Sequence, residues 1–196
     1  MWCRCHTDER ERQDALTAAG FQPLPERDLR LIHALALPLP SASLPHGFSL
    51  QYGVTSTELE AYQELHQAVF GGIGMSMDYH LSDAYQPELD LIARDQHGHY
   101  AAFCQCACTQ ITDTQGAQTV GEIGVIGTRP GYRQQGLGHA LLITALDLLR
   151  THGATGAFLE TSESNAPARR LFASVGWTQL STWQWHISQP EPSPPK

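Results

Sequence analysis

A glycine-rich, basic loop that runs directly into an apolar segment constrains this chain more than any other feature. The loop reads GTRPGYRQQGLG from Gly127 to Gly138, and the residues after it, ALLITALDLL, have helical apolar spacing. A glycine-rich loop at a helix start leaves unpaired N–H groups at the positive end of the helix dipole. The pattern therefore predicts an anion site, with phosphate as its natural ligand, where a helix over 137–152 begins.

Two common phosphate-binding motifs do not fit these residues. The Walker loop requires Lys and then Ser or Thr directly after its last glycine, but Leu137 and Gly138 follow Gly136. The dinucleotide fingerprint requires a third Gly or Ala, and Leu141 stands at that position. Both of these nucleotide-binding classes are therefore excluded.

The size and charge of the chain narrow the function classes further. Its 196 residues suit one complete domain, and its formal net charge of −8 argues against a nucleic-acid partner. The longest apolar runs fall well short of the ~18 residues that span a bilayer. The five cysteines are an odd number, and no leader-like segment opens the chain, so we expect a soluble protein of the reducing cytoplasm.

Apolar periodicity and turn residues predict nine elements after residue 45. The ranges are strand 48–54, helix 55–70, strands 88–95, 100–111 and 120–127, helix 137–152, strand 156–162, helix 167–175 and strand 177–187. The order β-α-β-β-β-α-β-α-β predicts an α/β fold with a mixed, mostly antiparallel central sheet and helices on both faces. Thr57, with Glu58 and Glu60, is expected to cap the first of these helices.

Three cysteines alternate along one predicted strand. Cys104, Cys106 and Cys108 therefore share one face of its sheet, and buried free thiols are the expected state. A zinc site completed by residues near the N-terminus, Cys3, Cys5 and His6, is the alternative, but zinc ligands must converge from more than one element. No metal is expected.

The segment RQQGLG, from Arg133 to Gly138, resembles the pyrophosphate loop of the GNAT superfamily of acyl-CoA-dependent N-acetyltransferases, which has the form [R/Q]-x-x-G-x-[G/A]. A second block, FLETSESNAPARRLFASVGW, is similar to the strand and helix that follow in that family. The resemblance covers residues 47–187 and is strongest over 121–177. It implies a GNAT fold and transfer of an acetyl group from acetyl-CoA to a primary amine of a small molecule or peptide.

The resemblance also implies which residues hold acetyl-CoA. The end of the strand before the loop contacts the pantetheine arm through its backbone, the loop amides hold the pyrophosphate, and an asparagine near the next helix contacts the CoA arm. The residues implied are Ile126, Gly127, Thr128, Arg133, Gln134, Gln135, Gly136, Leu137, Gly138, His139 and Asn165.

Two carboxylates are candidates for the general base. The attacking amine must lose a proton near neutral pH, and Glu122 and Glu160 lie on the strands before and after the predicted helix. Strand alternation places Glu122, Gly124 and Ile126 on one face unless a bulge intervenes. A solvated or hydrogen-bonded strand-end carboxylate is the alternative for each glutamate.

One departure from the family leaves the activity open. Many relatives carry a tyrosine as acid to the departing CoA thiolate where this chain has Phe172. A catalytically weak or inactive CoA-binding or CoA-sensing lobe is therefore an alternative, and an interaction module is a third. Phe70, Met75 and Tyr79 are expected either to border the acceptor groove or to pack in the core.

The N-terminal region echoes the C-terminal one. Residues 15–21 resemble residues 171–177, and the same offset then aligns Leu29 and Leu31 with Trp185 and Ile187. We therefore interpret residues 1–45 as the helix-strand remnant of a second GNAT-like lobe plus a Pro-rich linker, 46–188 as the acetyltransferase domain and 189–196 as a disordered tail. The strand at 27–33 is expected to pair with this chain's sheet or with a second copy, which leaves a homodimer open.

Overall fold

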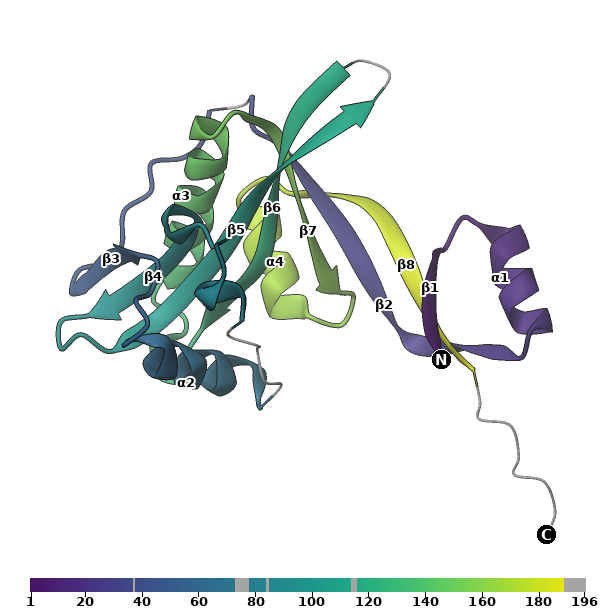
Figure 1. Ribbon diagram of the computed structural model, residues 1–196, viewed down its shortest axis with the longest axis horizontal. Helices are drawn as coiled ribbons and strands as arrows, with labels where there is room; N and C mark the ends of the chain where they lie inside the picture. The colour runs from purple at the N-terminus through teal and green to yellow at the C-terminus, as the bar shows by residue number, and fades with distance from the viewer. Residues whose placement is uncertain (37, 73–77, 84, 114–115, 189–196) are drawn as a thin grey trace, which may run out of the picture. The chain divides into compact units, whose positions relative to one another are not determined.

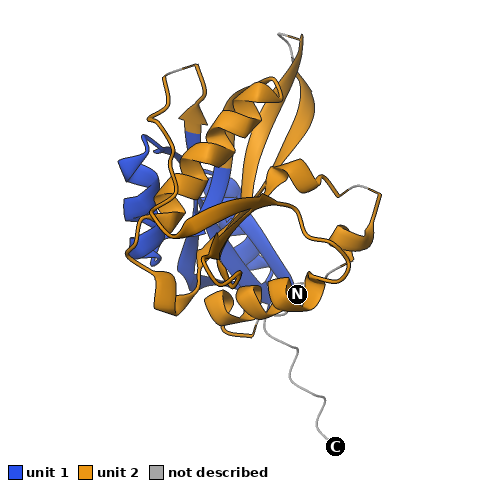
Figure 2. Ribbon diagram, turned by 90° about the vertical axis from the view of Figure 1, so that its left-hand side faces the viewer, with its two compact units in different colours: residues 1–32, 159–196 blue, residues 33–158 orange. Residues whose placement is uncertain are grey.

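The computed structural model describes residues 1–36, 38–72, 78–83, 85–113 and 116–188, so the tail and Met75 lie outside the described residues. The chain divides into two compact units, residues 33–158 and residues 1–32 with 159–196 (Figure 2). From residue 48 onward the α-helices and strands follow the predicted order, which confirms the fold class. Within the described parts, no helix has the length and apolarity to cross a membrane.

The unit formed by residues 33–158 is built on an antiparallel run of strands (Figure 1). Each strand pairs with the next along the chain. The strands are β3 (Phe48–Tyr52), β4 (Asp90–Asp95), β5 (Tyr100–Asp113) and β6 (Gly116–Thr128). β5 and β6 are both longer than predicted, because their pairing continues to Asp113 and Gly116 through a segment that the turn-like letters TDTQGAQT assign to a loop.

Helices cover both faces of this sheet, as predicted. α2 (Leu59–Phe70) and α3 (Leu137–Thr151) both pack against β5 and β6. A Cβ atom on Gly121 would lie 2.7 Å from Leu149 of α3, whereas one on Gly127 would lie 2.5 Å from Val69 of α2. The two glycines are opposite Cys108 and Phe103, which point to opposite faces of β5, so the two helices lie on opposite sides.

A bulge in β6 changes which residues share a face. Cys106 pairs with Ile123, but the preceding Gln105 pairs with Val125, so Gly124 is an extra residue in β6. Glu122 is therefore on the face that α2 covers, while Ile126 points to the opposite face. Glu122 and Ile126 were expected on one face unless a bulge intervened, and the bulge does intervene and reverses the alternation between them.

The helical apolar spacing from which α2 was predicted forms a buried face. Tyr62 and Leu65 are fully buried, and Leu59 and Val69 pack against the same cluster. The predicted cap is wrong: α2 begins at Leu59, the residue before it is Glu58, and no side chain caps the helix. The Glu58 carboxylate accepts instead from the N–H of Thr55 at 2.9 Å, so it closes the preceding turn.

We expect Gly127→Ala to destabilise the protein by about 1–3 kcal/mol, the usual cost of overpacking a core. The added methyl group would lie 2.5 Å from Val69 and 3.0 Å from Phe103. Chemical denaturation measures the change, and Gly124→Ala is the matched control, since its Cβ would lie 3.7 Å from the nearest atom. Equal stabilities of the two variants would contradict this account.

The described part of the other unit contains two complete strands, parts of two further strands and two helices. β8 (Thr178–Ser188) lies between β1 (Trp2–His6) and β2 (Phe21–Ala34), and both pairings are antiparallel. The helices are α1 (Arg10–Ala18) and α4 (Ala166–Ser174). β7 (Ala154–Ser162) begins in the first unit and ends in this one. Of the two alternatives for the strand at 27–33, the structure contains the intramolecular pairing.

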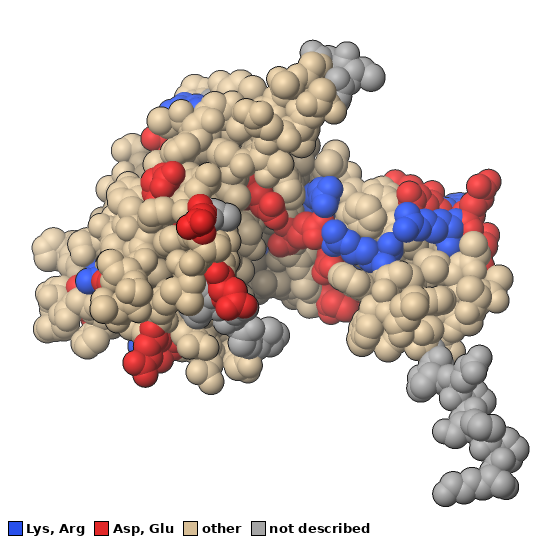
Figure 3. Space-filling model, in the orientation of Figure 1, with Lys and Arg blue, Asp and Glu red and all other residues tan. Residues whose placement is uncertain are grey.

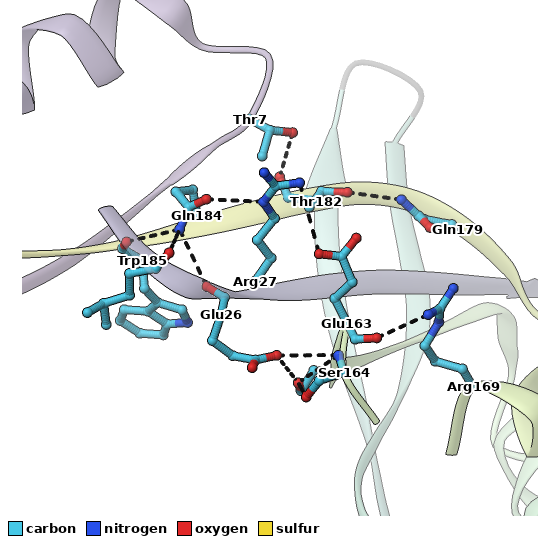
Figure 4. Close-up of polar contacts among 12 residues, drawn as sticks. Thr7, Glu26, Arg27, Glu163, Ser164, Arg169, Gln179, Thr182, Gln184 and Trp185 are labelled. Carbon is cyan, nitrogen blue, oxygen red and sulfur yellow. Dashed lines mark hydrogen bonds and ion pairs between the residues drawn. The ribbon is translucent and has the colours of Figure 1, made fainter. Parts of the chain in front are cut away.

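The N-terminal echo has a structural counterpart. α1 and α4 have nine residues each and occupy equivalent positions of the repeat, as do β2 and β8. The pairing of β2 with β8 has the symmetry of the repeat. Arg27 is opposite Gln184 and Asp28 is opposite Trp183, while the repeat aligns Arg27 with Trp183 and Asp28 with Gln184. Side chains reinforce it, because Arg27 donates to the Gln184 side chain at 3.2 Å and lies 4.0 Å from Glu163 (Figure 4).

The predicted cysteine face is confirmed in part. Cys104 and Cys106 are buried and Cys108 is half-buried, and all three are free thiols. Cys5 is buried on β1, with its Sγ 3.9 Å from Nδ1 of His186. Among the described residues no group of three or more His, Cys, Asp or Glu side chains is placed to hold a metal ion.

Candidate active site

The glycine-rich loop has the backbone geometry of an anion site. β6 ends at Thr128, a short 3-10 helix covers Pro130–Tyr132, and α3 starts at Leu137. Gly136 directly precedes α3 with φ of 86°, a left-handed conformation that favours glycine. Gln134 has φ of 63°, and it is the one residue other than glycine with positive φ in the described chain.

The amide groups of this loop are available to a ligand. Within the described residues, the N–H groups of residues 134–139 donate to no other backbone group, and the N–H of Ala140 is the first to do so, at 3.0 Å from Gly136. Leu137 is buried and anchors the helix start, whereas residues 133–136 before it and His139 after it are exposed. Of the predicted pyrophosphate residues, Gln134, Gln135, Gly136, Leu137, Gly138 and His139 therefore form one continuous run of unpaired backbone donors, here called the cradle. The N–H of Arg133 lies outside it, because it donates to the carbonyl oxygen of Pro130 at 3.4 Å.

Two side-chain contacts fix the shape of the loop. Arg133 donates from Nε to the carbonyl oxygen of Thr128 at 3.1 Å, which ties the loop to the end of β6. The Tyr132 hydroxyl donates to Asp95 at 2.7 Å. This hydrogen bond, together with backbone N–H groups and the ring of His99, holds the pKa of Asp95 well below its ordinary value. The carboxylate therefore stays ionised and keeps its hold on the loop at neutral pH.

The residues predicted to contact the pantetheine arm are divided between the two units. Ile126, Gly127 and Thr128 end β6, next to the loop, and pair with β5. Asn165 lies in the other unit, where its side chain accepts from the N–H of Ala168 at 3.3 Å and so caps α4. This capping bond is a structural role that the sequence analysis did not assign to Asn165.

Glu122 borders a cavity on the α2 face of the sheet. The cavity has a volume of about 240 Å³ and is lined by Tyr79, Gln105, Cys106, Ala107, Glu122 and Gly124. Ala107 lies directly opposite Glu122 across the β5–β6 pair, and Gly124 has no side chain, so these two small residues leave the space beside the carboxylate. A half-buried carboxylate at the edge of a cavity can accept a proton from a bound amine.

Glu160 has a different environment. It accepts from Arg4 and from Arg30, each at 2.7 Å, and Arg4 also lies 4.9 Å from the ring centre of Trp183. Figure 3 shows arginine and carboxylate side chains gathered over the unit that contains Glu160, residues 1–32 with 159–196. Burial opposes ionisation of Glu160, but the hydrogen bonds and charges of the two arginines outweigh it, so its pKa lies below the ordinary 4.5. A carboxylate held in this way is a weak proton acceptor.

We expect Glu160→Gln to flatten the loss of stability in acid. Because the pKa of Glu160 is lowered on folding, the unfolded chain binds more protons, so the contribution of this group is present above pH 4.5 and is lost as the pH falls below that value. Urea denaturation of both proteins between pH 3 and 7 measures the difference. Parallel pH profiles would show that the ion pairs make no contribution.

Several residues around Glu122 and around Glu160 were not predicted from the sequence. Gln105, Ala107 and Gly124 line the cavity, but nothing in the letters marks them before the bulge fixes the register. Arg4 and Arg30 both contact Glu160, and β1, which carries Arg4, was not predicted because the five residues WCRCH are too few to show a clear periodicity. The signal that could have found Arg4 is the internal repeat, since it aligns Arg4 with Glu160. Of the three residues expected near the acceptor groove, Tyr79 lines the cavity, while Phe70 packs against His66 and Phe103.

The fold and the loop together define the class of protein. A mixed sheet with helices on both faces, and a glycine-rich turn of free amides between β6 and α3, are typical of enzymes that transfer acyl groups from CoA. The chain belongs to the acetyltransferase (GNAT) family, whose model matches residues 59–177.

Similar proteins point the same way. A mycothiol acetyltransferase of Thermobispora bispora is 30% identical over 175 residues, which cover 84% of this chain and 58% of the relative. The chain thus spans little more than half the length of this curated relative. A GCN5-related N-acetyltransferase of Sphaerobacter thermophilus has the same fold, with a TM-score of 0.76 at 20% identity over 96% of this chain and 61% of that one. A tandem GNAT protein from the clavulanic acid biosynthesis pathway superposes with a TM-score of 0.73 at 14% identity over 94% of this chain and 60% of that one.

Proposed function

We propose that the protein is an N-acetyltransferase that transfers the acetyl group of acetyl-CoA to a primary amine of a small molecule or peptide. The observation that carries this proposal is that β6 joins two sites. Its end leads into the cradle of free amides at residues 134–139, and its middle places Glu122 beside a cavity. From Glu122 to Thr128 an extended strand covers roughly 20 Å. CoA likewise places a long arm between its diphosphate and its thioester.

In this proposal each group has one task. The amides of residues 134–139 and the start of α3 hold the diphosphate, and the backbone of Ile126, Gly127 and Thr128 lies along the pantetheine arm. Asn165 is a further contact for the CoA arm through whatever part of its amide the helix cap leaves free. Glu122 takes the proton from the attacking amine, while Glu160, held by two arginines, is not the base.

The test has two stages. Calorimetric titration with acetyl-CoA comes first, and no binding at millimolar ligand would overturn the proposal. The second stage measures free thiol release over a panel of primary amines that includes the acceptor of the mycothiol acetyltransferases, because those relatives suggest one acceptor class. Release of thiol that depends on one amine, together with mass-spectrometric detection of its amide, is the expected result.

A CoA-binding lobe without transfer is the second candidate, and Phe172 favours it. Phenylalanine has no hydroxyl where relatives carry the tyrosine acid. The Phe172 ring is buried, with its centre 6.2 Å from that of Trp177. In the acetyltransferase proposal the thiolate instead takes a proton from water or leaves unprotonated, since thiols titrate near pH 8.5. Acetyl-CoA binding without thiol release from any amine of the panel would favour the second candidate.

A further inference from the structure

A buried carboxylate lies close to the cavity that Glu122 borders, because Asp90 is opposite Gln105, one of the residues that line the cavity. Asp90, the first residue of β4, is fully buried and accepts from the Tyr62 hydroxyl at 2.9 Å and from the Tyr85 hydroxyl at 2.8 Å. The Nε2 atom of His80 lies 3.3 Å from the same carboxylate oxygen as Tyr85, and the His80 side chain is also fully buried. Burial of a carboxylate costs free energy that only hydrogen bonds or charge pairing offset, so Asp90 depends on these partners.

Tyr62 and Tyr85 are the donors in their hydrogen bonds to Asp90, and the Asp90 carboxylate is the acceptor. Burial, and then the negative charge of Asp90, raise the pKa values of both Tyr62 and Tyr85 above their ordinary values, so both hydroxyls remain protonated donors. The Tyr85 oxygen also accepts from the N–H of Val54 at 2.9 Å, which joins it to the end of β3. Tyr85 is therefore held at its hydroxyl from two sides.

The rings of Tyr85 and His80, which lie against Asp90, both contact the Tyr79 ring. The Tyr79 ring meets the Tyr85 ring edge to face, with centres 5.5 Å apart, and meets the His80 ring at 5.6 Å. His80 and Tyr85 also pack against each other at 4.9 Å. Edge-to-face pairs have a preferred geometry, so these contacts orient the Tyr79 ring.

Tyr79 and Glu122 line the same cavity, and their chemistry selects its occupant. Glu122 is the charged residue among the described residues that line the cavity, and no Arg or Lys borders it. An aromatic ring and a carboxylate across a small space bind an ammonium group, through cation–π attraction and charge. A volume of about 240 Å³ accommodates a compact amine.

We propose that Asp90 is a positioning residue: through Tyr85, with the His80 ring packed beside it, Asp90 fixes the Tyr79 ring as the wall of a cavity for the ammonium head of a compact amine. This inference rests on the proposed function and names its acceptor class. Asp90 itself touches neither acceptor nor acetyl-CoA, so its effect is on the affinity for the amine.

Steady-state kinetics of Tyr79→Leu, Asp90→Asn and the double variant test the inference. Loss of a cation–π contact is expected to raise the KM for the amine about three- to tenfold in each single variant. The KM for acetyl-CoA is expected to stay within about twofold, because the cradle at residues 134–139 is untouched. In the double variant the amine KM should match that of Tyr79→Leu, since Asp90 acts through Tyr79.

The controls separate positioning from general destabilisation. Tyr85→Phe keeps the ring but removes the hydroxyl that donates to Asp90, so it should raise the amine KM even if Asp90→Asn folds poorly. Tyr52→Leu changes a tyrosine on β3 that is 50% exposed and should leave both KM values unchanged. Additive effects in the double variant, or equal rises in both KM values, would overturn the inference.

A binding measurement keeps this test separate from that of the proposed function. The dissociation constant of ethylamine, measured by NMR titration without acetyl-CoA, is expected to rise about three- to tenfold in Tyr79→Leu and Tyr85→Phe. That readout is independent of turnover. Ethylamine that binds the wild type and these variants equally would refute the inference even for a protein that acetylates amines. Binding that weakens as expected, with no acetylation, would refute only the proposed transfer.

Discussion

Glu122→Gln is expected to lower kcat/KM for the amine about 100-fold or more, the usual contribution of a general base. The substitution keeps the shape of the side chain beside Ala107 and Gly124 but removes its ability to accept a proton from the bound amine. Thiol release measured with the best amine of the panel gives the ratio. Acetyl-CoA affinity, measured by calorimetry on the same protein, is expected to stay unchanged.

Glu160→Gln is the matched comparison for this variant. Because Glu160 is held by Arg4 and Arg30 and its pKa lies below the ordinary value, Glu160→Gln should lower the activity by less than about tenfold. A larger loss in Glu160→Gln than in Glu122→Gln would exchange the two assignments. Unchanged rates in both variants would remove both carboxylates from consideration as the base.

Gly136→Val is expected to weaken acetyl-CoA binding about 100-fold. Gly136 has φ of 86°, where an ordinary side chain costs about 1–2 kcal/mol and a β-branched one is a clear outlier. Relief of this strain turns the amides of the loop away from their common direction, and the new side chain also occupies space that the diphosphate needs. Calorimetric titration with acetyl-CoA measures the loss directly.

The same loop provides the control for this substitution. Gly131 has no positive φ, and a Cβ atom built there would have no neighbour within 4 Å, so Gly131→Val should bind acetyl-CoA nearly as well as the wild type. If both valine variants lose affinity equally, crowding of the loop in general is the cause. If neither loses affinity, the diphosphate does not lie against these amides.

Local patterns were sufficient to predict most of the fold. α3 was predicted from Leu137 to one residue beyond its observed end, and α4 was predicted one residue late at each end, since helical periodicity is contained within a few turns of chain. β5 and β6 were located by their apolar residues, although their length depends on pairing across the hairpin. The glycine-rich loop was found because its function depends on consecutive residues.

What could not be predicted depends on contacts between distant residues. The bulge at Gly124 is defined by the partner strand, and only the bulge decides that Glu122 and Ile126 face opposite sides. The two arginines that neutralise Glu160 come from β1 and β2, far away in the chain, so Glu122 and Glu160 appear equivalent in the letters. The buried partners of Asp90 are likewise brought together from α2, the segment after it and β4.

The extra residue in β6, Gly124, separates the part of the strand that borders the cavity from the part that leads into the glycine-rich loop. Residues on the Glu122 side of Gly124 border the cavity, whereas residues after it lead into the loop. Because the strand reverses its faces at Gly124, substitutions of side chains around the cavity need not disturb the backbone that leads to the cradle. Under the proposed function, substitutions that change the preferred amine can therefore be confined to the part of β6 before Gly124, apart from the loop expected to hold acetyl-CoA.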